Sequence, residues 1–312
     1  MYFPVADITV SVWVPPLVAF CVSFFTSMGG VSGAFLLLPF QMTFLGYTSP
    51  SVSATNQVFN IVAIPSGVLR YMREGRMVWP LTWIVIIGTL PGVFLGAIIR
   101  VAWLPDPNSF KLFAAVVLAY IGVRMTRDLM AGPGKNGRKA AEQHFQNMAA
   151  RFRSKQNEGE SIRPVEVLSF TRSRLVYRFY EETFDVSTMG VSLLCFLVGI
   201  VGGVYGIGGG SIVAPFFVSI LGLPVYTVAG AALMGTFVTS VAGVAFYQFI
   251  QPWYPGMHVA PDWSLGLLFG LGGMAGMYLG ACCQKYVSAR AIKWMLAVIL
   301  LFTAAKYVLS AL

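Results

Sequence analysis

Charged residues are scarce in this sequence, and acidic residues are the scarcest of them. Only 11% of the 312 residues are charged, whereas 57% are hydrophobic and the mean hydropathy is +0.73. A soluble domain carries about 25% charged residues, so this composition excludes the water-soluble class. Apolar runs of about 20 residues, the length that crosses a bilayer, recur along both halves. The sequence therefore predicts a protein that crosses the membrane several times.

Acidic and imidazole side chains are missing from the apolar runs. None of the 12 acidic residues lies in the body of a run, and both histidines, His144 and His258, lie between runs. A proton relay across a bilayer uses ionisable side chains within the membrane. A hydrolase of the membrane interior needs a cluster of His, Asp or Glu to hold a metal or activate a nucleophile. We therefore expect no enzyme, no catalytic residue, no metal site and no cofactor.

Cysteine is also rare, and its spacing excludes two further classes. The four cysteines all lie in apolar runs and none forms a CxxC pair, so we expect neither a disulfide framework nor a metal site. The N-terminus has no positively charged region and no small-residue cleavage site before its first apolar run. No removable signal peptide is therefore expected.

Positive charge is abundant, with a formal net charge of +9, but it is concentrated between the apolar runs. Twelve of the 21 Lys and Arg residues lie between Arg124 and Arg178. This clustering is typical of the positive-inside rule rather than of a nucleic-acid-binding face, so no nucleic-acid partner is expected. Residues 127–183 are predicted to form a basic cytoplasmic linker. Within it, Phe145, Met148, Ala149 and Phe152 share one helical face, so an interfacial helix on anionic lipid is the alternative.

The hydropathy predicts an all-α polytopic membrane protein with five apolar segments in each half. In the first half these are Val10–Met28, Val31–Gly46, Val52–Tyr71, Met77–Ile99 and Phe110–Met125; in the second they are Val186–Tyr205, Ser211–Gly222, Val225–Ile250, Ser264–Gln284 and Ala291–Leu309. The membrane domains are thus residues 1–126 and 184–312. The second segment of each half is short and contains a proline, which predicts a hairpin of two discontinuous helices.

A glycine-rich turn occurs in both halves and indicates that the chain is a duplication. The clearer copy is Gly206–Ser211, followed by Pro215 and Phe216. When the sequence is shifted by 176 positions (215 − 39), the copy in the first half aligns with the copy in the second half without a gap. The matches include Pro39 with Pro215, Gly30 with Gly206, Gly33 with Gly209, Gly46 with Gly222, Val52 with Val228, Gly67 with Gly243 and Tyr71 with Tyr247. Agreement at one offset over this length is not expected from composition alone.

The charge of equivalent loops predicts that the two repeats have inverted topology. The loop after the third segment is basic in the first half and lacks Lys and Arg in the second, whereas the loop after the fourth segment shows the opposite. After the third segment, the first half has Arg70, Arg73 and Arg76, whereas residues 251–262 of the second half contain no Lys or Arg. After the fourth segment, the first half has Arg100, Asp106 and Lys111, and the second half has Lys285, Arg290 and Lys293. Since cytoplasmic loops carry the excess of Lys and Arg, both termini are expected outside. Inverted repeats bind substrate at the midplane between broken helices.

Glycines inside a membrane need an explanation, because each bare backbone amide in hydrocarbon costs several kcal/mol. Backbone N–H groups at a helix N-terminus attract anions through the helix dipole. Each glycine turn precedes a short helix, so two such ends converge. We therefore expect an anion site that includes Ser32, Gly33, Gly208, Gly209, Gly210 and Ser211. The alternative, close helix packing, is expected for the GxxxG-type pairs Gly92/Gly96, Gly272/Gly276 and Gly276/Gly280.

Neutral polar side chains are the other candidates for substrate binding. The third segments contain Asn56, Gln57 and Asn60 in one half and Thr236, Thr239 and Ser240 in the other. Amides within a span are unfavourable unless hydrogen-bonded, so these side chains face the bundle interior. We expect Asn56, Gln57, Asn60, Thr236 and Thr239 to contact the substrate. Hydrogen bonding between helices is the alternative role.

These motifs resemble those of the TauE/SafE sulfite exporter family. The G-x-G-G-G-x-x-x-x-P pattern is present at Gly206–Pro215, and its variant at Gly30–Pro39 has Ser32 and Ala34 where glycines would be expected. The resemblance covers both membrane halves. It implies a multi-pass permease of the bacterial inner membrane for small sulfur-containing anions such as sulfite, sulfoacetate or thiosulfate.

The predicted function is export of such an anion, and the predicted partners are this substrate and the lipid bilayer. A membrane potential that is negative inside expels anions with about 2.3 kcal/mol per charge per 100 mV, so export needs no coupling ion. Two alternatives remain open at this point, a coupled importer of a sulfur-containing anion and an anion channel without alternating access. The oligomeric state does not follow from these residues.

Overall fold

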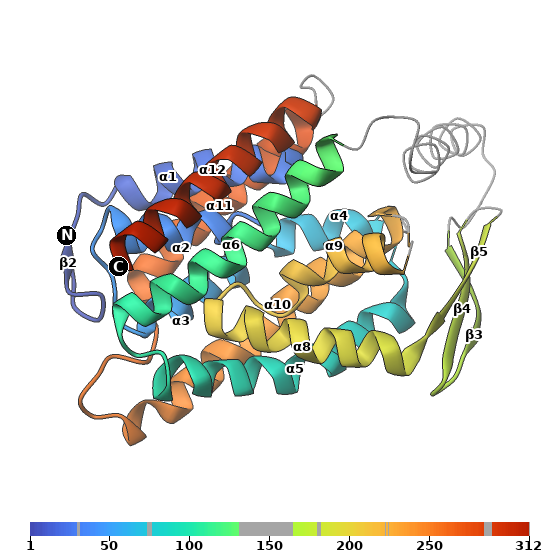
Figure 1. Cartoon of the computed structure of the whole chain (residues 1–312), viewed down its shortest axis with the longest axis horizontal. Coiled ribbons are helices and arrows are strands. Elements are labelled where there is room, and N and C mark those ends of the chain that lie inside the picture. The colour runs from blue at the N-terminus through green and yellow to red at the C-terminus, as the bar shows by residue number, and fades with distance from the viewer. Residues whose placement is uncertain are drawn as a thin grey trace.

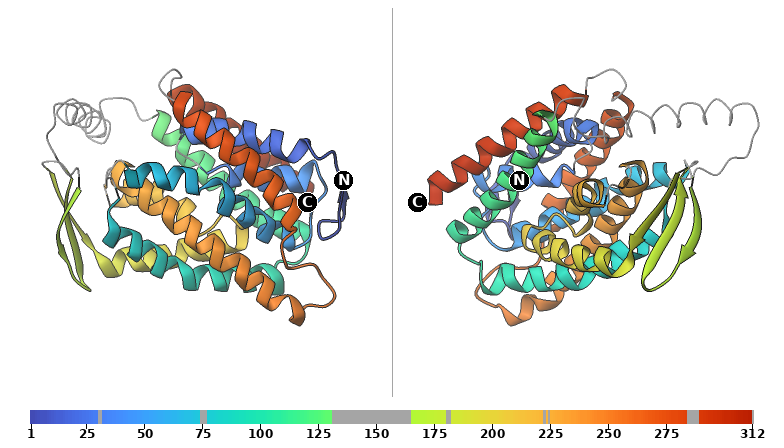
Figure 2. Two further views of the ribbon diagram at one scale, coloured as in Figure 1. Left: turned by 180° about the vertical axis from the view of Figure 1, so that it is seen from behind. Right: turned by 45° about the vertical axis from the view of Figure 1, so that its right-hand side comes forward.

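The computed structural model describes residues 1–29, 32–73, 77–130, 165–179, 182–221, 223, 225–283 and 289–311. Over these residues the protein is mostly helical, and its helices form one bundle (Figure 1). Both chain termini lie at one end of the bundle, and a small antiparallel sheet lies at the opposite end (Figure 2). The predicted class, a helical membrane protein, is confirmed.

The helices follow the predicted apolar segments closely. They are α1 (Val14–Gly29), α2 (Ala34–Thr43), α3 (Ser51–Ala63), α4 (Pro65–Arg73), α5 (Trp79–Ala102), α6 (Pro107–Met130), α8 (Thr188–Tyr205), α9 (Gly210–Ile220), α10 (Val225–Ile250), α11 (Trp263–Cys283) and α12 (Ala289–Ala311), with a 3-10 turn, η1, at Gln251–Trp253. Every predicted segment contains a described helix. The third segment of the first half is divided into α3 and α4 at Pro65, since proline has no N–H to donate within a helix.

Five of the described helices are long and apolar enough to cross a membrane. They cover Trp79–Ala102, Pro107–Arg127, Thr188–Tyr205, Thr227–Trp253 and Trp263–Gly280. By contrast, α2 has 10 residues and α9 has 11. At 1.5 Å per residue each extends about half the hydrocarbon thickness of a bilayer. These two helices therefore begin and end inside the bundle.

The helix boundaries repeat at the same 176-residue offset as the sequence. The last residue of α1 corresponds to the last residue of α8, and the first residue of α2 corresponds to the first residue of α9. The packing partners repeat as well. The helix α5 packs on α8 as α11 packs on α1, while α10 packs on α5 as α3 packs on α11. The remaining pair, α6 and α12, pack on each other.

Glycines allow the closest of these helix contacts, as their spacing predicts. A Cβ atom added at Gly92 or Gly96 of α5 would lie 2.8 Å from the backbone nitrogen of Ile200 or Val204 of α8. Likewise, a Cβ atom at Gly276 of α11 would lie 3.0 Å from the carbonyl carbon of Phe20 in α1. The GxxxG-type pairs therefore have the packing role expected for small residues between membrane helices.

The sheet is a feature that the sequence analysis did not anticipate within the basic linker. It consists of β3 (Val165–Phe170), β4 (Arg174–Phe179) and β5 (Glu182–Ser187) in antiparallel order β3-β4-β5. In β4 the buried side chains Leu175, Tyr177 and Phe179 alternate with more exposed ones, the period of a half-buried strand. A second pair, β1 (Tyr2–Phe3) and β2 (Ile8–Thr9), lies near the N-terminus. The interfacial-helix alternative lies outside the described residues.

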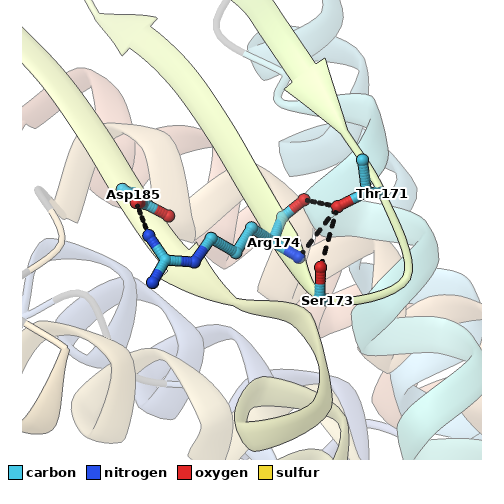
Figure 3. A network of polar contacts seen from close by, with 4 residues as sticks. All are labelled: Thr171, Ser173, Arg174 and Asp185. Atoms are coloured by element: carbon cyan, nitrogen blue, oxygen red, sulfur yellow. Dashed lines mark hydrogen bonds and ion pairs between the residues drawn. The ribbon is translucent and has the colours of Figure 1, made fainter.

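Polar contacts close the turn between β3 and β4 and join β4 to β5. The hydroxyl of Thr171 donates to the carbonyl of Arg174, whose backbone N–H in turn donates to the same hydroxyl, both at 3.0 Å (Figure 3). The Arg174 guanidinium pairs with Asp185 at 2.8 Å. Because both side chains are exposed, this pair adds little to stability. The sheet is anchored instead by Tyr177, whose hydroxyl lies 3.0 Å from that of Thr227 in α10.

Exposed tryptophans occur at both ends of the bundle. Trp13, Trp103, Trp253 and Trp263 lie where α1 begins, α5 ends, α10 ends and α11 begins; Trp79 and Trp83 lie where α5 begins. Tryptophan is enriched at both interfaces of a membrane. The two groups are separated by the length of α5, whose 24 residues extend about 36 Å. The bundle therefore has the dimensions of a bilayer.

Candidate functional site

A short polar helix, α3, lies at the centre of the bundle. Its residues from Ser51 to Asn60 are all buried, including three hydroxyl and three amide side chains. The helix packs against α2, α10 and α11. Polar groups are buried at a substantial free-energy cost unless they are hydrogen-bonded. The partners of the α3 side chains therefore indicate which groups are structural and which remain available to a ligand.

Asn56 connects the N-terminus of α2 to the glycine turn between α8 and α9. Its Nδ2 donates to the carbonyl of Ala34, the first residue of α2, and to the carbonyl of Gly206, both at 3.1 Å. Its Oδ1 accepts from Nε2 of Gln41 at 3.5 Å. One side chain therefore connects the start of the short helix α2 to the turn that precedes the short helix α9.

Asn60 connects α3 to the same turn one helical turn further along. Its Nδ2 donates to the carbonyl of Ile207 at 3.0 Å and to the hydroxyl of Ser240 in α10 at 3.3 Å. Its Oδ1 has no hydrogen-bond partner among the described residues. The donors of both asparagines are thus used in holding the turn, while one acceptor is free.

The second glycine turn, which we define as Gly206–Gly209, closes α8 and opens α9. Gly206 has φ +76° and caps α8, and Gly208 has φ +75°. The backbone N–H groups of Gly206 and Ile207 both donate to the carbonyl of Gly202 at 3.0 Å. Since φ values near +75° are rarely adopted by L side chains, glycine at positions 206 and 208 has a conformational reason independent of any ligand.

The hydroxyls predicted to contact substrate lie around this turn. Thr239 Oγ1 accepts from the backbone N–H of Gly209 at 3.1 Å, and Ser211 Oγ donates to the carbonyl of Ile207 at 2.6 Å. The Ser211 and Thr236 hydroxyls lie 3.2 Å apart. Gly210 packs against α10 so closely that an added Cβ would lie 2.6 Å from the backbone nitrogen of Thr236. The fold therefore brings together all the candidates from the second repeat.

The candidates of the first repeat approach them through α3. The hydroxyl of Ser32 accepts from the backbone N–H of Ala34 at 3.3 Å. A Cβ atom at Gly33 would lie 2.9 Å from the hydroxyl of Ser23 in α1. Gly30 and Val31, which complete the predicted first turn, lie outside the described residues. Because Asn56 donates to both Ala34 and Gly206, the start of α2 and the second glycine turn both lie against α3.

Gln57 differs from the other predicted site residues. Its side chain is fully buried, yet neither Oε1 nor Nε2 has a hydrogen-bond partner among the described residues. The amide lies against Gly243 of α10, where an added Cβ would come within 2.9 Å of Nε2. An unpaired buried amide costs about 1–3 kcal/mol. In α3, both polar atoms of the Gln57 amide and Oδ1 of Asn60 are thus buried without a partner among the described residues.

Two buried polar residues of the bundle were missed from the sequence. Gln41 of α2 is buried, and its Oε1 has no partner among the described residues; a lone amide in a short apolar helix was the available signal. Arg100 was assigned to the loop after the fourth segment, but α5 extends to Ala102 and buries this arginine completely. The error arose because Arg100 immediately follows an apolar run, where a charge ordinarily marks the end of a span.

The comparisons with known proteins agree with this architecture. The family model described as "Sulfite exporter TauE/SafE" matches residues 16–307 of the chain. The match includes both glycine turns and the helices that contain the candidate residues, α2, α3, α9 and α10. No curated protein and no solved structure matches the chain.

Proposed function

Since the chain belongs to the TauE/SafE sulfite exporter family, we propose that it exports a small sulfur-containing oxyanion across the bacterial inner membrane. Sulfite, sulfoacetate and thiosulfate are the candidate substrates. The family consists of transporters, and the helices described here suit a multi-pass membrane protein. The substrate binds in the space around α3, between the N-termini of α2 and α9.

The observation that carries this proposal is the double hydrogen bond of Asn56. Its Nδ2 lies 3.1 Å from Ala34 O and 3.1 Å from Gly206 O, so the starts of α2 and α9 lie close together. Each helix N-terminus carries a partial positive charge of roughly half an elementary charge and unpaired N–H groups. Two such termini attract an anion without any formal positive charge in the site.

The unpaired amides suit an oxyanion of this kind. Nε2 of Gln57 can donate to an anionic oxygen, and Oε1 of Gln57 and Oδ1 of Asn60 can accept from a protonated one. Hydrogen sulfite has both an anionic oxygen and a proton to donate. Of the eleven predicted site residues, Gln57 is therefore the one to which we assign direct substrate contact first. The remaining predicted ligands stay part of the same proposal.

We further propose that the two repeats have inverted topology and that transport is driven by the membrane potential. The repeated helix boundaries and packing partners support a duplicated structure. A membrane potential of 100 mV changes the free energy of a monovalent anion by about 2.3 kcal/mol, which corresponds to roughly a fiftyfold ratio of its concentrations across the membrane. An exporter can therefore work without a coupling ion.

Sulfite efflux from proteoliposomes, with an imposed potential negative inside, tests the proposal. Wild type should show efflux that saturates and supports counterflow, as a carrier does. Gln57→Leu should lower the efflux at least tenfold, because it removes a hydrogen bond to a charged group worth about 1.5–3 kcal/mol. The matched control is Gln248→Leu, the same replacement at an exposed position of α10, which should leave the rate unchanged.

Each rival predicts a different result in this assay. Single-channel currents without counterflow would indicate an anion channel, and accumulation of sulfite inside vesicles under an ion gradient would indicate an importer. Normal efflux by Gln57→Leu, with the protein folded, would contradict substrate contact at this amide. Absence of sulfite movement in wild type would contradict sulfite as the substrate, and the same assay would then be run with sulfoacetate and thiosulfate.

A further inference from the structure

A positive charge lies completely buried at the end of α5. Arg100 has no exposed surface and belongs to the last turn of this helix. Burying a charge is strongly unfavourable unless it is paired and hydrogen-bonded. Ionisable residues inside the membrane part of a protein commonly mark an ion pathway. The surroundings of Arg100 therefore decide whether it has a structural partner.

The guanidinium of Arg100 is held on one edge and unpaired on another. It stacks over the ring of Phe110 in α6, with Cζ 3.8 Å from the ring centroid, and its Nη1 donates to the carbonyl of Leu104. Nε and Nη2 have no hydrogen-bond partner among the described residues. These two nitrogens share one edge of the planar group. Their N–H bonds form the fork that binds two oxygens of a carboxylate, phosphate or similar oxyanion.

No described acidic side chain neutralises this charge. The ionisable groups that interact electrostatically with Arg100 are Tyr247 and Tyr47, which are uncharged at neutral pH. Both tyrosine hydroxyls are engaged elsewhere, since Tyr247 donates to the carbonyl of Gly203 at 3.3 Å and Tyr47 donates to Ser51 at 2.8 Å. The positive charge is therefore available to a mobile anion.

The carbonyls at the end of α8 are the obvious structural partners, but they are already occupied. The helices α5 and α8 run in parallel, since Gly92 approaches Ile200 and Gly96 approaches Val204. Arg100 lies one helical turn beyond Gly96, where α5 continues past the end of α8 at Tyr205. At the end of α8, the carbonyls of Gly202, Gly203 and Val204 accept bonds from the turn, from Tyr247 and from Ser53, respectively.

An aromatic chain joins Arg100 to the site proposed above. The ring of Phe110 lies 6.5 Å from that of Tyr205, the residue that immediately precedes Gly206. The hydroxyl of Tyr205 donates to the carbonyl of Phe35 in α2 at 3.1 Å. Phe110 and Tyr205 therefore link Arg100 to α2 and to the residue before the second glycine turn. Arg100 lies on the side toward the chain termini, because α5 ends at that end of the bundle (Figure 1).

We infer that Arg100 forms a second anion-binding site, which receives the transported oxyanion between the glycine turn and the end of the bundle that carries the termini. This inference rests on the proposed function for the identity of the anion. The Nε and Nη2 edge binds two oxygens of a small sulfur oxyanion, and the buried position strengthens their attraction. An anion that leaves the uncharged site at α3 thus meets a charged site on its way to the end of the bundle that carries the termini.

Calorimetric titration of sulfite into the purified full-length protein in nanodiscs tests this inference, with oxygen excluded. Wild type should bind two sulfites per chain. Arg100→Met should lose one of them, and Arg100→Lys should retain it with at least tenfold weaker affinity, because an ammonium lacks the fork. The control is Arg127→Met at an exposed position of α6, which should retain both.

A structural role for Arg100 makes different predictions. Replacement of an unpaired buried charge by an apolar side chain of similar length should leave the melting temperature unchanged or raise it. A lowered melting temperature for Arg100→Met, with both sulfites still bound by the folded fraction, would overturn the inference. So would a wild type that binds one sulfite, lost in Gln57→Leu and retained in Arg100→Met.

The outcomes for this site and for the proposed function are separable. Sulfite binding that depends on Arg100, in a protein that shows no efflux, would support the site and reject the proposed function. Normal efflux with binding that is unaffected by Arg100→Met would support the proposed function and reject the site. If the Arg100 site and the proposed function are both correct, Arg100→Met should show reduced efflux and should still bind the sulfite that depends on Gln57.

Discussion

Two glycines of the second glycine turn have backbone conformations that other residues adopt only at a cost. Gly206 and Gly208 have φ values of +76° and +75°, and an L side chain in this region costs about 1–2 kcal/mol. Space is also restricted, because a Cβ at Gly208 would lie 2.8 Å from the hydroxyl of Ser240 and 2.9 Å from Cγ2 of Thr236. Substitution of these glycines therefore tests folding before it tests binding.

Gly208→Ala should lower the melting temperature of the purified protein by several degrees, because backbone strain and contact with α10 act together. The matched control is Gly256→Ala, in the loop before α11, where an added Cβ meets nothing within 4 Å. That variant should melt within about a degree of wild type, since surface changes ordinarily alter stability by less than about 0.5 kcal/mol. Equal melting temperatures for the two variants would contradict the turn conformation described here.

At the scale of elements, α3 has two kinds of buried amide that are adjacent in sequence. Asn56 makes its hydrogen bonds to Ala34 and Gly206, whereas Gln57 has no partner among the described residues. The first amide holds α2 and α9 against α3. The second contributes nothing to those contacts and is the amide that we propose to bind substrate. The helix thus has a paired and an unpaired amide at two successive positions.

The two amides should respond oppositely to the same replacement. Asn56→Leu removes the two hydrogen bonds to Ala34 O and Gly206 O, each worth about 0.5–1.5 kcal/mol, so the melting temperature should fall. Gln57→Leu replaces an unpaired amide by an apolar group of similar size, so its melting temperature should equal or exceed that of wild type. Thermal unfolding of both variants in one detergent makes the comparison. A lower melting temperature for Gln57→Leu than for Asn56→Leu would contradict these assignments.

At the scale of the whole molecule, the two ends of the bundle are chemically different. One end carries both termini and the exposed Trp13, Trp103, Trp253 and Trp263; the other carries the three-stranded sheet and the start of α5 (Figure 2). The loop charges predict that the sheet end faces the cytoplasm. If the repeats are inverted, the equivalent loops after α4 and after α10 lie on opposite sides.

Cysteine labelling in cells tests this orientation, after alanine has replaced the four native cysteines. A membrane-impermeant maleimide should label Gly256→Cys, beyond α10, in intact cells. Arg73→Cys, the last residue of α4, should be labelled only after permeabilisation, because inverted repeats place the end of α4 on the side opposite to the end of α10. Ser173→Cys, between β3 and β4, reports on the sheet end and should behave as Arg73→Cys does. Labelling of Gly256→Cys and Arg73→Cys from the same side would contradict inverted repeats.

The sequence by itself determined the membrane class, the apolar segments and the duplication. These follow from hydropathy and from residue identity at one offset, both of which are properties of the chain taken in order. The same reasoning located the closely packed glycines of α5 and α11, because their spacing follows the helical period. It also identified α3 as polar within an apolar context. The alternation of Leu175, Tyr177 and Phe179 could have revealed β4, but it was hidden among basic residues.

The tertiary structure alone decided which polar groups are paired. Hydrogen bonds from Asn56 to Ala34 and Gly206 connect positions 22 and 150 residues away, and no local pattern specifies them. Arg100 lies one residue beyond the predicted apolar segment, so only the packing of α5, α6 and α8 around it shows that it is buried. Whether a side chain in a membrane protein is structural or free depends on the atoms that surround it, and those come from distant parts of the chain.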